Sequence, residues 1–289
     1  MTEFRHKNLL IRVVTALAMI PPVLGVTYLG FPYFNILIAA AIAAMAWEWS
    51  CMVGGGRFGY QGWILAVGLF AAVVVASLGA YIHALLTLAL TGVLLIAISE
   101  FMRLTVKLPM HSAEMDQAVK AKVALWMAAG AFYIGIPCVS LIWIRSDWDN
   151  GLLAVIWLLV LVWSADSGAY AAGRMIGGPK MAPRISPNKT WAGLGGCVIA
   201  AAIAGVGVAQ FAGLDGYMKI EAALISGLVG MVSQGGDLVE SAFKRHFGVK
   251  DSSHLIPGHG GVLDRVDALL AAVVAAALIN LTSKVALVS

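Results

Sequence analysis

Apolar residues occur along this chain in long runs, and polar residues are confined to the stretches between them. Each run has roughly the 17–25 residues that a helix needs to cross a bilayer, without the alternation typical of a membrane β-barrel strand. The pattern therefore predicts an all-α, polytopic integral membrane helical bundle of about nine transmembrane helices. The runs lie near residues 9–29, 33–52, 63–80, 82–99, 123–144, 152–172, 192–212, 221–237 and 262–284.

Composition supports this fold class and excludes a soluble domain. Hydrophobic residues make up 61% of the 289 residues, and charged residues only 12%. The net charge of +4 comes from basic residues gathered in alternate loops, which indicates topology and predicts no nucleic-acid partner. By the positive-inside rule, the N-terminus and the loops at 173–191 and 238–261 face the cytoplasm. With no organelle-targeting pattern, we expect a bacterial inner (plasma) membrane.

The N-terminal apolar run and the three cysteines give little information about function. The N-terminal apolar run resembles a signal peptide, but it is longer than a signal core and lacks a small-residue cleavage site, so we interpret it as a retained first span. Cys51, Cys138 and Cys197 are isolated in or beside apolar runs. Their spacing fits neither a metal site nor a disulfide framework.

The chain shows no soluble domain, low-complexity tract or clear internal repeat. We therefore predict one membrane-embedded catalytic domain over residues 1–289. Its N-terminal half, about 1–122, is expected to be mainly scaffold, and its C-terminal half, about 123–289, to carry the active site. The polar stretch at about 103–122 is compatible with a short interfacial helix.

Ionisable residues concentrate between 237 and 267, beside two apolar runs where charge is costly. If the eighth helix continues past Asp237, then Asp237, Glu240, Ser241, Lys244 and Arg245 share one face. A carboxylate at the C-terminal end of a helix gains nothing from the helix dipole, so we favour a metal ligand over a solvated helix end for Asp237.

The start of the ninth helix carries two more acids, Asp264 and Asp267, one turn apart. Acids are also favoured in the first turn of a helix, but carboxylates that share a segment with several bases suit Mg²⁺ and substrate phosphates. Asp237, Asp264 and Asp267 are the predicted metal ligands. Gly260 and Gly261 precede this helix, where exposed backbone N–H groups can approach an anion, and His259 is a candidate for orienting a phosphate.

Other candidates lie outside this cluster. Asp166 is an acid inside the sixth span, and such residues normally face a cavity or a basic partner. Glu48 and Glu100 lie near the inner ends of other spans and are ranked below Asp166, as interfacial anchors. The loop at 173–191 combines small, hydroxyl and basic residues that suit a lipid phosphate, although a positive loop touching anionic lipid would look similar. Its candidate substrate-binding residues are Ser186, Asn188, Lys189 and Thr190.

The residues from 241 to 267 resemble the signature of the phosphatidate cytidylyltransferases (CDP-diacylglycerol synthases), with no departure from it. The stretches around Asp166 and around Ser186–Thr190 also resemble this family. The resemblance extends over the whole chain and is most specific in the C-terminal half. The matching residues are Ser241-Ala242-Phe243-Lys244-Arg245, Lys250-Asp251, Ser253, Ile256-Pro257, His259-Gly260-Gly261-Val262 and Asp264-Arg265-Val266-Asp267.

The resemblance implies an enzyme that joins CTP and phosphatidic acid to give CDP-diacylglycerol and pyrophosphate. It further implies Mg²⁺ dependence, a homodimer, and metal-binding, catalytic roles for Asp237 and Asp264; a second metal ion, divalent or monovalent, is left open. Substrate-binding candidates are Ser241, Gly260, Gly261 and Asp166 with the four residues of the 173–191 loop. The candidate catalytic residues besides the two acids are Lys244, Arg245, Lys250, His259 and Arg265.

Three other functions are compatible with parts of the pattern. A CTP-dependent lipid-alcohol kinase of the polyprenol or phytol type shares related motifs but releases CDP. An ion-coupled transporter would also carry intramembrane acids, but transporters tend to show repeats and broken helices. A catalytically dead lipid-binding scaffold conflicts with the intact signature.

Overall fold

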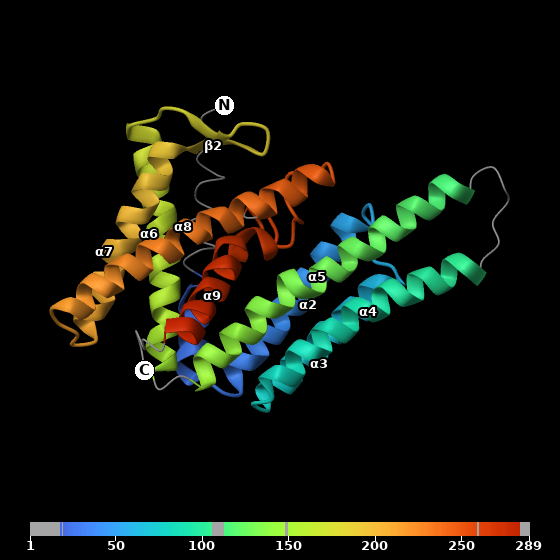
Figure 1. The fold of residues 1–289 in the computed structure, drawn as a ribbon, viewed down its shortest axis with the longest axis horizontal. Helices are drawn as coiled ribbons and strands as arrows, with labels where there is room; N and C mark the ends of the chain where they lie inside the picture. The colour runs from blue at the N-terminus through green and yellow to red at the C-terminus, as the bar shows by residue number, and fades with distance from the viewer. Residues whose placement is uncertain (1–17, 19, 106–112, 148–149, 259, 284–289) are drawn as a thin grey trace. The chain divides into compact units, whose positions relative to one another are not determined.

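A computed structural model of the chain describes residues 18, 20–105, 113–147, 150–258 and 260–283. Within these residues, seven helices have the length and apolar character needed to cross a membrane. The predicted all-α, polytopic membrane architecture is confirmed. The helices, in chain order and shown in Figure 1, are α2 (Tyr33–Val53), α3 (Tyr60–Ser77), α4 (Tyr81–Thr105), α5 (Ala113–Asp147), α6 (Gly151–Met175), α7 (Trp191–Phe211), α8 (Tyr217–His246) and α9 (Leu263–Ser283).

The first and ninth predicted spans need separate mention. The first run is described only where an apolar helix covers Ile20–Leu29, so residues 9–17 and 19 of that prediction lie outside the described residues. Helix α9 starts within a residue of its predicted position, but it carries Asp264, Arg265 and Asp267 at its beginning. Helix α9 is not one of the seven helices that have the length and apolar character needed to cross a membrane.

The chain forms two compact units. The N-terminal unit comprises residues 1–143 and 251–264, and the C-terminal unit comprises 144–250 and 265–289. These units are discontinuous in sequence, because α5 extends from Ala113 to Asp147 and the segment 251–264 belongs with the N-terminal helices; the division into scaffold and active site near residue 122 stays a prediction. The polar stretch at 103–122 is not a separate interfacial helix in the described part, where α4 and α5 each continue into it.

In the N-terminal unit, helices approach closely at small residues. A Cβ atom on Gly68 of α3 would lie 2.1 Å from Thr91 Oγ1 of α4, and one on Gly130 of α5 would lie 2.3 Å from Trp49 Nε1 of α2. The Trp49 indole also donates to the Trp126 carbonyl oxygen at 2.9 Å. Small residues that admit a neighbouring helix or ring are typical of membrane bundles, where close packing provides much of the association energy.

The C-terminal unit uses the same packing. A Cβ atom on Gly168 of α6 would lie 2.4 Å from the Cβ of Ala200 on α7, and one on Gly236 of α8 would lie 2.4 Å from the Cβ of Ala271 on α9. Figure 1 shows α6 and α7 side by side, as their contacts require. Because α6 also contacts α8, the helices that carry Asp166, Asp237 and Asp267 pack together within this unit.

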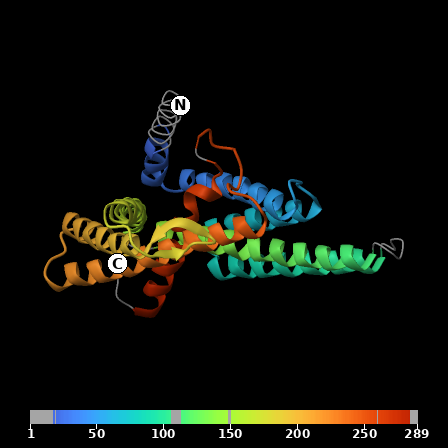
Figure 2. The same ribbon diagram turned by 90° about the horizontal axis from the view of Figure 1, so that it is seen from above.

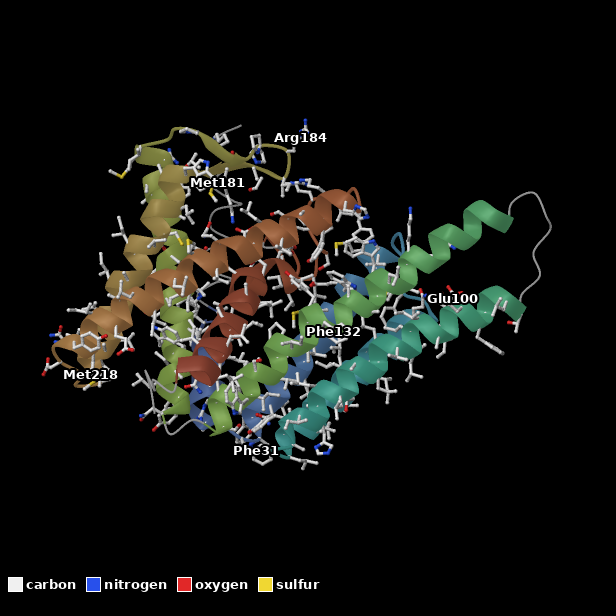
Figure 3. All side chains as sticks on the ribbon, viewed as in Figure 1. Phe31, Glu100, Phe132, Met181, Arg184 and Met218 are labelled. Carbon is white, nitrogen blue, oxygen red and sulfur yellow. The ribbon has the colours of Figure 1, made fainter. Side chains whose placement is uncertain are left out.

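A β-hairpin connects α6 and α7, which the sequence pattern did not predict. Strand β1 (Lys180–Ala182) pairs antiparallel with β2 (Ser186–Thr190). Figure 2 shows the hairpin, in yellow, from above. Its turn carries the exposed side chain of Arg184 (Figure 3). At the end of β2, Thr190 caps α7, because its hydroxyl accepts a hydrogen bond from the Gly193 backbone N–H at 3.0 Å.

Candidate active site

Asp237 is held by a lysine from the hairpin. Its carboxylate contacts Lys189 Nζ at 2.6 Å and accepts a hydrogen bond from Ser241 Oγ, one turn along α8, at 3.3 Å. Helix α8 continues to His246, beyond the predicted end of this span at residue 237, so Asp237 lies inside the helix and not at its end. The side chains of Lys189 and Asp237 remain 16% and 31% exposed, which leaves the pair accessible to a ligand.

Asp166 joins the same group through α8. Its carboxylate accepts a hydrogen bond from the Gln234 side-chain amide at 3.0 Å, and Lys189 also donates to the Gln234 backbone oxygen at 3.2 Å. Lys189 therefore links the residues that the sequence had placed in separate motifs. Asp166 is thus linked to α8 within the C-terminal unit through Gln234, and its role in substrate binding stays a prediction.

Asp267 of α9 completes an acidic group in this unit. Its Oδ1 accepts a hydrogen bond from the Ala268 backbone N–H at 2.8 Å, and it lies within range of the charges of Asp237, Asp166 and Lys244. Arg265 and Lys189 lie within range of Asp166. Asp166, Asp237 and Asp267 therefore contribute negative charge to one region of this unit, within range of lysine and arginine side chains. Like charges gathered in this way favour a bound cation.

The bases of the signature also have defined partners. Lys244 forms an ion pair with Glu240 at 2.5 Å, and the Glu240 side chain is fully buried. Arg245 donates from Nε to the Ile185 oxygen of the hairpin at 3.4 Å and from Nη1 to the Val249 oxygen at 3.1 Å. Arg245 therefore connects the end of α8 to the hairpin, and Glu240 restricts the position of Lys244.

Asp264 lies in a hydrogen-bond network of the N-terminal unit. It is 8% exposed, and its Oδ2 accepts from the Ser252 backbone N–H at 2.9 Å, the Ser252 hydroxyl at 2.9 Å and the Gly261 backbone N–H at 2.8 Å. Three donors from the loop converge on this one oxygen. The segment from Ser252 to Asp264 is thereby closed into a compact loop.

Glu48 holds the same loop, although we ranked it as an interfacial anchor. Its side chain is fully buried and accepts from the Val262 and Leu263 backbone N–H groups and from the Ser253 hydroxyl, each at 2.7 Å. The sequence signal was only an acid between two tryptophans at the end of a span. Nothing in that signal reveals a partner more than two hundred residues away.

The remaining predicted residues are placed as follows. Ser186 and Asn188 lie on β2, and Asn188 is exposed. Thr190 is 3% exposed and its hydroxyl serves the cap of α7. Lys250 and Arg265 are exposed, as expected for bases that meet a soluble phosphate. His259 lies outside the described residues.

Comparisons with known proteins match nearly the whole chain. The model of the cytidylyltransferase family matches residues 10–282. The chain belongs to the cytidylyltransferase family. The phosphatidate cytidylyltransferase of Brucella suis is 36% identical over 92% of this chain and 90% of its own length. The phosphatidate cytidylyltransferase of Pseudomonas aeruginosa is 37% identical over 91% of this chain and 93% of its own length. The phosphatidate cytidylyltransferase of Haemophilus influenzae is 42% identical over 49% of this chain and 50% of its own length.

The cytidylyltransferase match includes every candidate residue described above. It also includes Glu48 and the hairpin, which lie outside the signature that first suggested the family. Membership in the family and the enzymatic class are therefore supported along the full length of both units.

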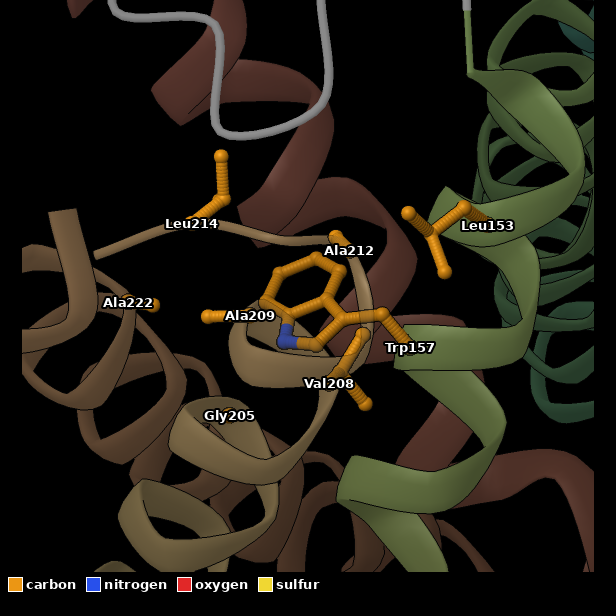
Figure 4. A pocket seen from close by; sticks show the side chains of 8 residues that line it. All are labelled: Leu153, Trp157, Gly205, Val208, Ala209, Ala212, Leu214 and Ala222. Carbon is orange, nitrogen blue, oxygen red and sulfur yellow. The ribbon is translucent and has the colours of Figure 1, made fainter.

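A cavity elsewhere in the C-terminal unit does not suit the polar reactants of a cytidylyltransferase. Figure 4 shows it beside Trp157, whose indole N–H donates to the Ser226 hydroxyl at 2.9 Å. Its lining contains no ionisable side chain, so it offers no partner to a phosphate. The lining residues are Leu153, Trp157, Gly205, Val208, Ala209, Ala212, Leu214 and Ala222.

The predicted metal ligands divide between the two networks. Asp237 and Asp267 belong to the acidic group of the C-terminal unit, and Asp264 belongs to the loop of the N-terminal unit. Among the described residues, no three histidine, cysteine or acidic side chains lie close enough together to hold a metal ion by themselves. Mg²⁺ is commonly bound by one or two carboxylates, with water and substrate phosphates completing its shell. The assignment of all three acids stays a prediction.

Proposed function

We propose that this cytidylyltransferase transfers the cytidylyl group of CTP to phosphatidic acid in phospholipid biosynthesis. A phosphate oxygen of the lipid attacks the α-phosphorus of CTP, and the bond to the leaving pyrophosphate breaks. The products are CDP-diacylglycerol and pyrophosphate. The observation that carries this proposal is the near-full-length similarity to proteins named phosphatidate cytidylyltransferase, together with a charged group placed on apolar helices.

The charge distribution suits this reaction. Both reactants are anions, so bringing them together is mainly an electrostatic problem. Lys189 and Lys244 lie beside the acidic group of the C-terminal unit, and Arg245, Lys250 and Arg265 add positive charge around the signature. These side chains bind and orient the phosphates of CTP and of the lipid. The lipid phosphate is itself the nucleophile, so no residue forms a covalent intermediate.

The acidic residues suit Mg²⁺ binding. Asp166, Asp237 and Asp267 gather negative charge on oxygen atoms, the ligand type that Mg²⁺ prefers. We propose Asp237 and Asp264 as metal-binding residues, with Asp267 as a further ligand. When bound, Mg²⁺ supplies charge neutralisation of the phosphates. The same acids would also balance the charge of a second metal ion, divalent or monovalent.

The cellular setting is proposed from the sequence. The seven apolar helices indicate an integral membrane protein. The basic loops support an active site that faces the cytoplasm, in a bacterial inner membrane. We further propose a homodimer, which the family resemblance supports; cross-linking of the protein in native membranes, read by mass, tests this.

Pyrophosphate release by detergent-purified protein tests the proposed function. CTP, phosphatidic acid and Mg²⁺ are supplied together and then singly omitted, with EDTA and Asp264→Asn as controls. The proposal predicts release that needs all three components and is lost in both controls. Formation of CDP on addition of a lipid alcohol, without pyrophosphate, would instead identify a lipid-alcohol kinase.

A further inference from the structure

The loop that carries the second half of the signature is anchored to an acid outside it. Glu48 lies near the end of α2, and the segment 251–264 meets its carboxylate with backbone and hydroxyl donors. All of these residues belong to the N-terminal unit. The contact therefore links the second helix to residues that immediately precede Asp264.

Both oxygens of Glu48 are used. Oε1 accepts from Ser253 Oγ and from Val262 N, and Oε2 accepts from Leu263 N, with the Ser252 hydroxyl 3.4 Å away. Val262 and Leu263 stand at the beginning of α9, where backbone N–H groups have no partner within the helix. A carboxylate is acceptor-only and negatively charged, so it suits these donors and the positive end of the helix dipole.

The loop fits closely around this carboxylate. A Cβ atom on Gly261 would lie 2.5 Å from Glu48 Oε1 and 2.0 Å from Ser252 Oγ, so only glycine allows the approach. Ser252 also donates to Asp264 at 2.9 Å from its hydroxyl and its backbone. Glu48 and Asp264 thus hold the same loop, and displacement of Glu48 would release donors at both ends of the segment that precedes Asp264.

We propose that Glu48 is a positioning residue for cytidylyl transfer, which fixes the 251–264 loop and thereby the carboxylate of Asp264. This inference rests on the proposed function for its effect on the reaction. Glu48 acts through backbone N–H groups and does not touch the substrates. A misplacement of catalytic groups by about 1 Å is enough to reduce a rate by about a hundredfold.

Replacements at Glu48 separate charge from volume. Glu48→Gln keeps the size of the side chain but replaces one oxygen with an N–H₂ group that faces a backbone N–H. Glu48→Asp keeps the charge but shortens the side chain. If the carboxylate positions the loop, kcat should decrease from wild type to Glu48→Asp and further to Glu48→Gln, which should lie at least about tenfold below wild type. A role in packing alone predicts that Gln exceeds Asp.

Hydrogen exchange read by mass spectrometry provides a measurement independent of turnover. In Glu48→Gln, peptides that cover 252–264 should take up deuterium about tenfold faster, and peptides from α3 should be unchanged. Glu100→Gln is the matched control, since Glu100 is an acid on the neighbouring α4 (Figure 3), and it should leave both readouts unchanged. Should Glu48→Gln fail to accumulate, Ser253→Ala removes one donor to Glu48 and is expected to change both readouts in the same direction, by about threefold.

Two results would overturn the proposal: kcat of Glu48→Gln equal to that of Glu100→Gln, or unchanged exchange across 252–264. For Ser253→Ala, no change in either readout would overturn it. If wild-type protein makes no CDP-diacylglycerol, the proposed function fails, but the exchange comparison still decides whether Glu48 holds the loop.

Discussion

Two acidic regions of this cytidylyltransferase neutralise their charge in different ways. In the N-terminal unit, Glu48 and Asp264 accept hydrogen bonds from backbone N–H groups and serine hydroxyls. In the C-terminal unit, Asp237 forms an ion pair with Lys189, and Asp166 and Asp267 lie within range of its charge and of other basic side chains. Backbone N–H groups are fixed by the fold of the chain. A lysine side chain, in contrast, can leave one anionic partner and bind another. The first region therefore fixes a loop, and the second is suited to receive charged substrates.

The largest effect is expected from Asp237→Asn, which removes charge from the centre of the second region. We expect kcat to fall by about a thousandfold, because developing charge in phosphoryl chemistry is stabilised mainly by fixed opposite charge and metal. Asp215→Asn is the matched control, since Asp215 forms an ion pair with Lys219 at 2.8 Å and its side chain is 89% exposed. Equal activities of the two variants in CDP-diacylglycerol synthesis would remove Asp237 from the site.

Gly261→Ala tests whether activity depends on a fixed loop in the N-terminal unit. The added methyl would overlap Ser252 and Glu48, so the loop must shift and activity should fall by about a hundredfold. Gly195→Ala serves as control, because a Cβ on this helical glycine of α7 meets nothing within 4 Å. Its thermal stability should be equal or slightly higher, by about 0.5–1 kcal/mol. Wild-type activity of Gly261→Ala would show that the loop tolerates displacement.

Lys189→Met tests whether the lysine of the hairpin binds a substrate phosphate. Loss of its ion pair with Asp237 should raise the KM for CTP or phosphatidic acid and lower kcat/KM by about tenfold, since each ionic hydrogen bond to a charged group contributes about 1.5–3 kcal/mol. Lys219→Met removes the comparable lysine of the exposed Lys219–Asp215 pair. An unchanged kcat/KM in Lys189→Met would mean that Lys189 only supports the hairpin.

Glu240→Gln should have the smallest effect on activity. Glu240 is fully buried beside Lys244, and the amide keeps one acceptor for the lysine. We expect about a threefold change in kcat/KM, together with a lower unfolding temperature, because weakening a buried ion pair leaves a charge poorly compensated. Glu221→Gln, also on α8, is the control. A thermal shift equal to that of the control would mean that the pair adds no stability.

Most of the membrane helices could be predicted from the lengths of the apolar runs alone. The starts of α2 and α9 agree with the expected pattern, because the beginning of an apolar run is a local feature, whereas α8 continues past its expected end at residue 237. The hairpin at 180–190 was missed, since its strands have three and five residues and lack apolar alternation. Short strands are held by register and by contacts with α7, which sequence periodicity does not report.

The site was predicted where chemistry lies in one motif and missed where it depends on distant partners. Asp237, Lys244 and Asp264 were singled out because they stand together in the charged stretch from 237 to 267, and their roles stay predictions. The link from Lys189 to Asp237 joins two of the predicted motifs, but only folding shows that they touch. Glu48 was underrated, because a buried carboxylate and an interfacial anchor have the same local sequence, and only its contact with Val262 and Leu263 distinguishes them.

The most direct test of the proposed reaction is to follow which phosphate of CTP enters the lipid. Purified protein in detergent is given phosphatidic acid, Mg²⁺ and CTP labelled either at the α- or at the γ-phosphorus. Cytidylyl transfer predicts α-label in the lipid fraction and γ-label in pyrophosphate, both lost in Asp237→Asn and retained in Asp215→Asn. Lipid labelled from the γ-position, or α-label that never leaves the soluble fraction, would contradict the assignment.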